Sequence, residues 1–186
     1  MPIKIIADVM FEQRVDPALV GSIDESRAAT EDGLAVNHDY FDMREYGLTD
    51  LREALEFEHE AFAQLEAADY SDEAIEEVDE EWAESCITPG IDFGVASSAL
   101  ALVAMGCIPI TSCRGKCLDE DHRHEAPCIS FYPARASVDS LVRFAKSANV
   151  CIVNNEDMLE IYSADLRLMH RFAVDVSQAL NAHTEI

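Results

Sequence analysis

The amino-acid sequence predicts an α+β fold: a mostly antiparallel four-stranded sheet covered by helices, with an acidic helical hairpin on its N-terminal side. Two observations support this prediction. In the C-terminal half, helix and strand signals follow one another in the order α-β-β-α-β-β-α. Before them, residues 50–84 combine narrow apolar stripes at helical spacing with 15 acidic residues and one basic residue.

The chain divides into three predicted parts, which are an irregular N-terminal segment over 1–48, the acidic helical hairpin over 49–87 and an α+β core domain over 88–186. The first part contains turn signals such as Asp16-Pro17 between short apolar pieces, and no long periodic pattern. We therefore expect little regular structure there.

Two helices are predicted in the acidic part, the first through about residue 68 and the second after a cap at Ser71. The apolar positions that define their buried faces are Leu51, Leu55, Phe62 and Leu65 in the first helix and Ile75, Val78 and Trp82 in the second. Because Trp82 is the largest apolar group of the second helix, we expect it to anchor the hairpin on the core.

The core domain begins with a helix of small side chains, for which Asp92 is the predicted N-cap. Pro109 favours an edge position for the strand that follows, because proline cannot donate to a sheet ladder. The elements expected in order are helix 93–105, strand 107–111, strand 128–132, helix 137–149, strand 150–153, strand 158–162 and a last helix after Ser163.

The net charge is −24, and more than half of it lies in residues 50–84. Nucleic-acid phosphates repel such a surface, so we expect no direct nucleic-acid binding. A basic protein partner fits it better, although acid-rich helices are also common simply as solvated faces. The carboxylates predicted to meet the partner are Glu73, Glu76, Glu77, Asp79, Glu80, Glu81 and Glu84.

The sequence also carries indications of its compartment. No apolar run approaches the roughly 20 residues of a membrane span, so no membrane association is expected. Asp8 follows the first residues too early for a signal peptide. We therefore expect a cytoplasmic protein. In that compartment the six cysteines are expected to be free thiols, metal ligands or redox groups in preference to disulfides.

Four of the six cysteines and two of the six histidines fall within residues 107–128. Thiolate and imidazole are the ligands that a tetrahedral zinc site prefers. If the strands on either side of this loop pair as a hairpin, Cys113 and Cys128 meet at its mouth, and Cys117 lies four residues beyond Cys113. We therefore predict a zinc site whose candidate ligands are Cys113, Cys117, His122, His124 and Cys128, with one histidine completing the tetrahedron.

Two other interpretations of the loop stay open. The histidines stand among acidic and basic residues, which is also typical of a solvent-exposed loop. Alternatively, Cys113 is a reactive thiol, since the cations of Arg114 and Lys116 adjoin it and a histidine is available as its base.

The stretch Thr111-Ser112-Cys113-Arg114-Gly115, which leaves a strand after a small-residue helix, resembles the Ser-Cys-x-Gly loop of the tRNA wybutosine-synthesising methyltransferase family. It is also similar to uncharacterised bacterial proteins with the same order of helix, Cys-x-Gly loop and strand. Ser112, Cys113 and Gly115 carry over. The resemblance implies a related fold, whereas the basic RNA-binding character of that family is absent from this acidic chain.

Two functions are consistent with these features. The leading hypothesis is a zinc-stabilised cytoplasmic binding module whose acidic surface engages a basic partner protein, as an antitoxin, immunity protein or nucleic-acid mimic does. The alternative is a small enzyme that uses a zinc-bound water or a reactive Cys113 in the 113–128 loop, for instance in RNA or nucleotide modification.

Overall fold

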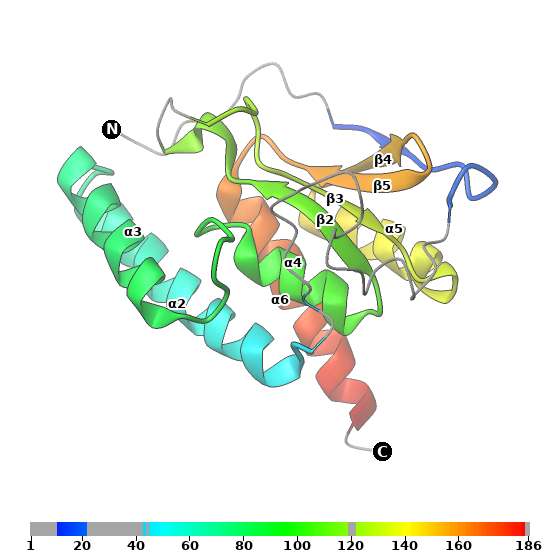
Figure 1. The fold of residues 1–186 in the computed structure, drawn as a ribbon, viewed down its shortest axis with the longest axis horizontal. Helices are drawn as coiled ribbons and strands as arrows, with labels where there is room; N and C mark the ends of the chain where they lie inside the picture. The colour runs from blue at the N-terminus through cyan, green and yellow to red at the C-terminus, as the bar shows by residue number, and fades with distance from the viewer. Residues whose placement is uncertain (1–10, 22–42, 44, 119–121, 185–186) are drawn as a thin grey trace.

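The computed structural model describes residues 11–21, 43, 45–118 and 122–184. Within them the chain forms five α-helices, one five-stranded sheet and two short 3-10 turns (Figure 1). The helices are α2 (Leu48–Ala67), α3 (Asp72–Ser85), α4 (Ala96–Ala104), α5 (Val138–Ala148) and α6 (Leu166–Thr184). The strands are β1 (Gln13–Arg14), β2 (Ile108–Cys113), β3 (Cys128–Tyr132), β4 (Cys151–Asn155) and β5 (Met158–Tyr162), and the turns are η1 (Gly115–Cys117) and η2 (Arg135–Ser137).

The α+β class is confirmed, but the predicted four-stranded sheet is wrong in one respect. The strand order is β1-β4-β5-β3-β2, and the four long strands pair antiparallel as predicted. The fifth strand, β1, pairs parallel with β4 and makes the sheet mixed. A strand of two residues is too short to show hydrophobic periodicity, so the sequence of the segment predicted to be irregular, 1–48, gave no indication of β1.

Strand β2 lies at the edge of the sheet, where Pro109 was expected to place it. Its register against β3 shifts between Pro109 and Thr111, and the ladder then continues to the last pair, Cys113 opposite Cys128. Proline is tolerated at such edges and irregularities because no N–H is required of it. The hairpin thus brings the two ends of the cysteine–histidine loop together, as the sequence indicated.

The core lies between the sheet and its helices. Helices α4, α5 and α6 cover one face of the sheet, and α2 packs across α4 and α6 on their far side, with α3 outermost (Figure 1). Ile129, Ile152 and Ile161 of the sheet and Phe172 of α6 are fully buried in one continuous apolar cluster. Burial at this scale supplies most of the stabilising free energy of a domain.

The two predicted acidic helices form, and their apolar residues belong to that same cluster rather than to a separate one. Trp82 is buried as expected, and its indole N–H donates to the carbonyl oxygen of Ile91 at 2.8 Å. Its ring meets that of Phe57 edge to face, with the ring centroids 5.0 Å apart. Trp82 therefore ties α3 both to α2 and to the segment that leads into α4.

Helix α4 begins later than predicted, at Ala96, and Asp92 does not cap it. A carboxylate from another helix takes that place: Glu58 of α2 is fully buried and accepts hydrogen bonds from the backbone N–H groups of Gly94 and Ser97. Its other oxygen accepts from the Ser97 hydroxyl at 2.5 Å and lies 3.1 Å from Nδ1 of His170 on α6. One acidic residue therefore joins three helices.

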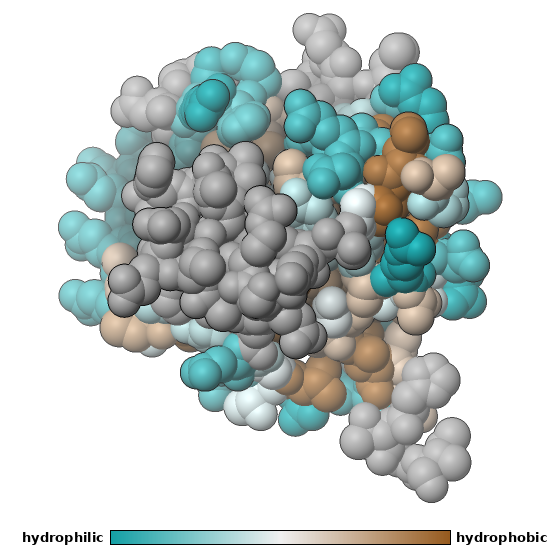
Figure 2. All heavy atoms as spheres, turned by 45° about the vertical axis from the view of Figure 1, so that its right-hand side comes forward, coloured by the Kyte–Doolittle hydropathy of each residue, from teal (hydrophilic) through white to brown (hydrophobic). Residues whose placement is uncertain are grey.

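Hydrophilic side chains predominate over the described part of the surface in Figure 2, and hydrophobic residues show mainly at the upper right and toward the lower edge of this view. Among the described helices, none combines the length and the apolar character that a membrane span requires.

Trp82→Ala should lower the free energy of unfolding by about 3–5 kcal/mol, because it removes a buried aromatic side chain. Trp82→Phe keeps a ring against Phe57 but leaves the Ile91 carbonyl without its donor, so a smaller loss of about 1–3 kcal/mol is expected. Urea unfolding followed by circular dichroism measures both values. A loss below 1 kcal/mol for Trp82→Ala would contradict the anchoring role of this side chain.

Candidate functional site

The candidate site lies where strand β2 ends. Cys113 is the last residue of β2, and Arg114 follows it into the turn η1. Asp79 reaches the same place from α3, Asp92 from the segment before α4, and His122 from the returning arm of the loop. Residues from four separate stretches of the chain therefore meet around one strand end.

The Cys113 sulfur faces two nitrogen atoms. It accepts a hydrogen bond from the backbone N–H of Gly115 at 3.3 Å, and it lies 3.6 Å from Nδ1 of His122. Gly115 has φ +64°, and a Cβ atom there would approach the carbonyl carbon of Ala126 to 2.4 Å. Glycine is therefore required at this position, where the turn passes against the backbone of Ala126.

Arg114 is the hub of the site and is itself 7% exposed. Its Nε donates to Nε2 of His122 at 2.9 Å, and its two Nη groups donate to the two carboxylate oxygens of Asp79, the Nη2 bond at 2.8 Å. Its backbone N–H donates to Oδ2 of Asp92 at 3.1 Å. A bidentate carboxylate is the partner a buried guanidinium requires, so this charge is well compensated.

The contact with Arg114 determines which ring nitrogen of His122 acts as the acceptor. A guanidinium is always protonated and only donates, so Nε2 of His122 must be the acceptor in their hydrogen bond. The imidazole then carries its proton on Nδ1, which faces the Cys113 sulfur and lies 3.7 Å from Oδ2 of Asp92. His122 consequently presents an N–H group, rather than a lone pair, to Cys113.

Asp92, Cys113 and His122 are also a group that can hold a metal ion, since one ligand atom of each lies within 4.8 Å of the others. Their spacing and chemistry suit a site with an open position. The hydrogen bond between Arg114 and Nε2 of His122 does not suit metal binding at Nδ1, however, because Nε2 is the acceptor in it. A metal on Nδ1 requires the proton on Nε2, and that proton would then face the Nε–H of Arg114.

Of the five predicted zinc ligands, only Cys113 and His122 belong to this group. Cys117 is buried in the main apolar cluster, and His124 is exposed. Cys128 lies opposite Cys113 in the sheet but outside the group of ligand atoms. Burial, with smaller contributions from the charges of Glu160 and Cys113, raises the pKa of the Cys128 thiol to about 12.

Sequence reasoning missed three residues of the site. Asp92 was predicted to be a helix cap, Asp79 an exposed partner-binding residue and Arg114 only a neighbouring cation. Asp92 and Asp79 lie 22 and 35 residues away along the chain from Arg114, which joins them. No local motif encodes such pairs, although the cysteine–histidine loop and the predicted hairpin did point to the end of this strand.

Two cavities border the site on the α3 side. One of about 450 Å³ has Trp82, Asp92 and Arg114 in its wall, and one of about 660 Å³ has Arg114 and Leu118 in its wall. Neither wall includes Cys113 itself, but both include its neighbour Arg114.

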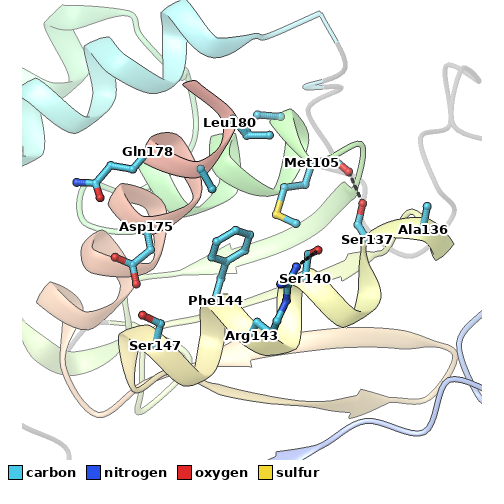
Figure 3. Close-up of a pocket in the computed structure, with 12 residues that line it drawn as sticks. Met105, Ala136, Ser137, Ser140, Arg143, Phe144, Ser147, Asp175, Gln178 and Leu180 are labelled. Atoms are coloured by element: carbon cyan, nitrogen blue, oxygen red, sulfur yellow. Dashed lines mark hydrogen bonds between the residues drawn. The ribbon is translucent and has the colours of Figure 1, made fainter. Parts of the chain in front are cut away.

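A larger hollow of about 850 Å³ lies elsewhere, between α5 and α6 (Figure 3). Phe144 and Met105 point into it, with Arg143 and Asp175 at its sides (Figure 3). Oδ2 of Asp175 is buried without a hydrogen-bond partner. None of the predicted site residues lines this hollow, and the group of possible metal ligands found among the described residues lies elsewhere, so the surroundings of Cys113 are the candidate site.

The acidic surface of α3 is largely as predicted. Six of the seven carboxylates predicted to meet a partner are exposed, namely Glu73, Glu76, Glu77, Glu80, Glu81 and Glu84. Asp79 is the exception, because it turns inward to Arg114.

Comparison of the chain with protein-family models, with curated proteins and with solved structures gives no match. The resemblance of the Ser112–Gly115 loop to the wybutosine-synthesising family therefore stays a prediction.

The Cys128 thiol should make stability depend on pH in the alkaline range. Below pH 9.0, its ordinary pKa, the thiol is protonated in both the folded and the unfolded chain. Above that pH the unfolded chain loses the proton while the folded chain keeps it until about pH 12, so stability falls as pH rises. One proton contributes a slope of at most about 1.4 kcal/mol per pH unit.

Urea unfolding between pH 8 and 11 (roughly the range over which the unfolded thiol ionises) measures this slope in the wild type and in Cys128→Ala. The variant should show a shallower decline. Parallel curves for the two proteins would contradict the assigned burial of this thiol.

Proposed function

We propose that the protein is a small thiol-dependent enzyme in which Cys113 is the nucleophile. The observation that supports this proposal is the position of its sulfur at a strand end, 3.3 Å from the Gly115 nitrogen and 3.6 Å from Nδ1 of His122. N–H donors stabilise negative charge on sulfur, and a thiolate is the nucleophilic form of cysteine. The nearby Asp92 carboxylate works against that charge, and the Arg114 guanidinium offsets it.

The other residues have defined roles in this proposal. His122 donates from Nδ1 to the sulfur and stabilises the negative charge of the thiolate, because its Nε2 accepts the hydrogen bond from Arg114. Arg114 is a positioning residue, since its Nε and both Nη groups are engaged by His122 and Asp79. The cavity of about 450 Å³ beside Asp92 and Arg114 is the candidate entry for a substrate.

Iodoacetamide labelling of the folded protein tests the nucleophile. Cys113, Cys117 and Cys128 are similarly buried, at 8%, 2% and 7% exposure, so burial alone predicts similar slow rates. We expect Cys113 to react at least about tenfold faster than the other two, because of its N–H donors. Site-resolved mass spectrometry over time measures the three rates.

His122→Phe should slow the labelling of Cys113, whereas exposed Cys86 should react equally in both proteins and serves as the internal control. Equal rates at Cys113, Cys117 and Cys128 would contradict the proposal. An unchanged Cys113 rate in His122→Phe would remove the histidine from the mechanism.

The second candidate function is a zinc-stabilised cytoplasmic binding module whose acidic surface engages a basic partner. Two observations favour it: the ligand atoms of Asp92, Cys113 and His122 lie within 4.8 Å of one another, and six α3 carboxylates are exposed. For zinc to bind at Nδ1, Arg114 must release Nε2 of His122. This requirement is the reason that we place the thiol enzyme first.

Zinc analysis of the purified, untagged chain tests the metal part of that candidate. It predicts one equivalent of zinc, lost in Cys113→Ser and kept in Cys117→Ser, because Cys117 lies outside the ligand group. Added zinc should raise the melting temperature of the metal-free chain. A chain that neither retains zinc nor gains stability from it contradicts a structural zinc site.

The acidic surface is tested with a lysine- and arginine-rich peptide and two matched quadruple variants. One replaces Glu76, Glu80, Glu81 and Glu84 of α3 by glutamine, and the other replaces Glu53, Glu56, Glu60 and Glu66 of α2. Both remove the same charge from exposed positions. Binding should weaken as salt screens it, and the α3 variant should lose more affinity than the α2 variant. Equal losses would show that only net charge matters.

A further inference from the structure

We propose that Cys113 and Cys128 form a peroxide-responsive dithiol pair, in which a hydroperoxide oxidises Cys113 and Cys128 then closes a disulfide with it. The inference rests on the proposed reactivity of Cys113 and adds a second residue and a co-substrate class to it. It also gives a role to Cys128, which the nucleophile alone does not use.

The sheet register places the two residues directly opposite each other. Cys113 is the last residue of β2, Cys128 is the first residue of β3, and the two are antiparallel partners. Directly opposed residues in antiparallel strands have Cα atoms about 4.5–5.5 Å apart. Disulfides span Cα separations of about 4.4–6.8 Å, so the two cysteines can be joined without moving either strand far.

Their position at the end of the ladder favours the bond. Pairing of β2 with β3 stops at Cys113, and the chain turns into η1 immediately afterwards. Strand ends adjust more easily than the centre of a sheet, where neighbouring pairs fix the backbone. Cross-strand geometry still departs from that of a relaxed disulfide, which makes such a bond easier to reduce and suits a reversible step.

The surroundings divide the roles between the two sulfurs. Cys113 receives the Gly115 N–H and faces Nδ1 of His122, so it is the sulfur prepared to attack an electrophile. Cys128 is buried between β2 and β5, opposite Cys113 on one side and Tyr162 on the other. Its exposure is similar to that of Cys113, but its pKa is raised by burial, which makes it the less reactive sulfur toward an oxidant and leaves it to resolve an oxidised Cys113.

The chemistry proceeds in two balanced steps. The Cys113 sulfur attacks the terminal oxygen of a hydroperoxide: the S–O bond forms, the O–O bond breaks, and the thiol proton leaves with the alkoxide as an alcohol or, from hydrogen peroxide, as water. The sulfur is oxidised to a sulfenic acid. The Cys128 sulfur then attacks the Cys113 sulfur, the S–S bond forms, the S–O bond breaks, and water leaves with the Cys128 proton.

Oxidation would also change the contacts of the loop. A sulfur bonded across to Cys128 is drawn away from His122 and Gly115, which removes a contact that holds the returning arm. His122 is in turn bound to Arg114, and Arg114 to Asp79 on α3. The redox state of the pair is therefore connected to the acidic helix through three consecutive side-chain contacts.

The experiment exposes the full chain to hydrogen peroxide, blocks free thiols with N-ethylmaleimide and maps tryptic peptides by mass spectrometry. The positions of lysine and arginine place Cys128 in peptide 124–135 and Cys117 in peptide 117–123, while Cys113 lies in peptide 53–114. We expect peptides 53–114 and 124–135 to become linked, with fragmentation locating the bond at Cys113 and dithiothreitol reversing it.

Three variants complete the test. Cys113→Ser should abolish the link, Cys117→Ser should leave its yield unchanged, and in Cys128→Ser dimedone should trap Cys113 as a sulfenic acid. A wild-type Cys113 that accumulates as sulfenic acid, or that links to Cys117, overturns the pair while leaving the nucleophile intact. A Cys113 that stays reduced while exposed Cys86 is oxidised overturns both the pair and the proposed function. The wild-type map decides these cases even if a variant fails to fold.

Discussion

The arrangement of the site depends on one buried cation. Arg114 follows an edge strand into the interior, and there it is bound by Asp79 of α3, by His122 of the loop and, through its backbone, by Asp92. Removing one partner of a buried ion pair typically costs about 3–5 kcal/mol, because the other charge stays uncompensated. The outer helix, the loop and the strand end are therefore held in one geometry by a single side chain.

The same interaction explains part of the acidic composition. Exposed carboxylates on α3 repel one another, and the Arg114 cation neutralises one member of the helix from the inside. A second acidic residue, Glu58, is not a surface charge at all, since it binds the start of α4 and faces His170 on α6. Some of the −24 net charge thus serves packing, while other carboxylates of α2 and α3 stay exposed to solvent.

Local sequence patterns predicted most of the fold. Apolar stripes located α2 and α3, and the strand signals around the cysteine loop predicted a hairpin that does bring Cys113 opposite Cys128. Strand β1 was missed because a two-residue strand is too short to show periodicity. The predicted start of α4 at an Asp92 cap was wrong because the carboxylate that binds the N-terminal N–H groups of this helix is that of Glu58, which lies far away in the sequence. Periodicity reports which face of an element is buried, and it does not report which polar groups meet.

The site was predicted less completely for the same reason. Residue types and spacing suggested five candidate ligands for one metal. In the folded chain, however, Cys117 is buried in the apolar core and His124 is exposed to solvent. The structure instead adds Asp92 to Cys113 and His122, and places an arginine behind the histidine. That arginine, which appeared in the sequence only as a cation near a thiol, determines whether the histidine serves as an N–H donor or as a metal ligand.

The tautomer of His122 is therefore the most direct test of this account. Long-range ¹H–¹⁵N correlation spectra of the uniformly ¹⁵N-labelled chain, assigned with the His122→Gln variant, distinguish the two ring nitrogens. We expect the imidazole of His122 to carry its proton on Nδ1 and to accept from Arg114 at Nε2, with the spectrum unchanged by zinc. A His122 protonated on Nε2, with an Nδ1 signal that shifts on addition of zinc, would contradict the thiol assignment and indicate a metal centre.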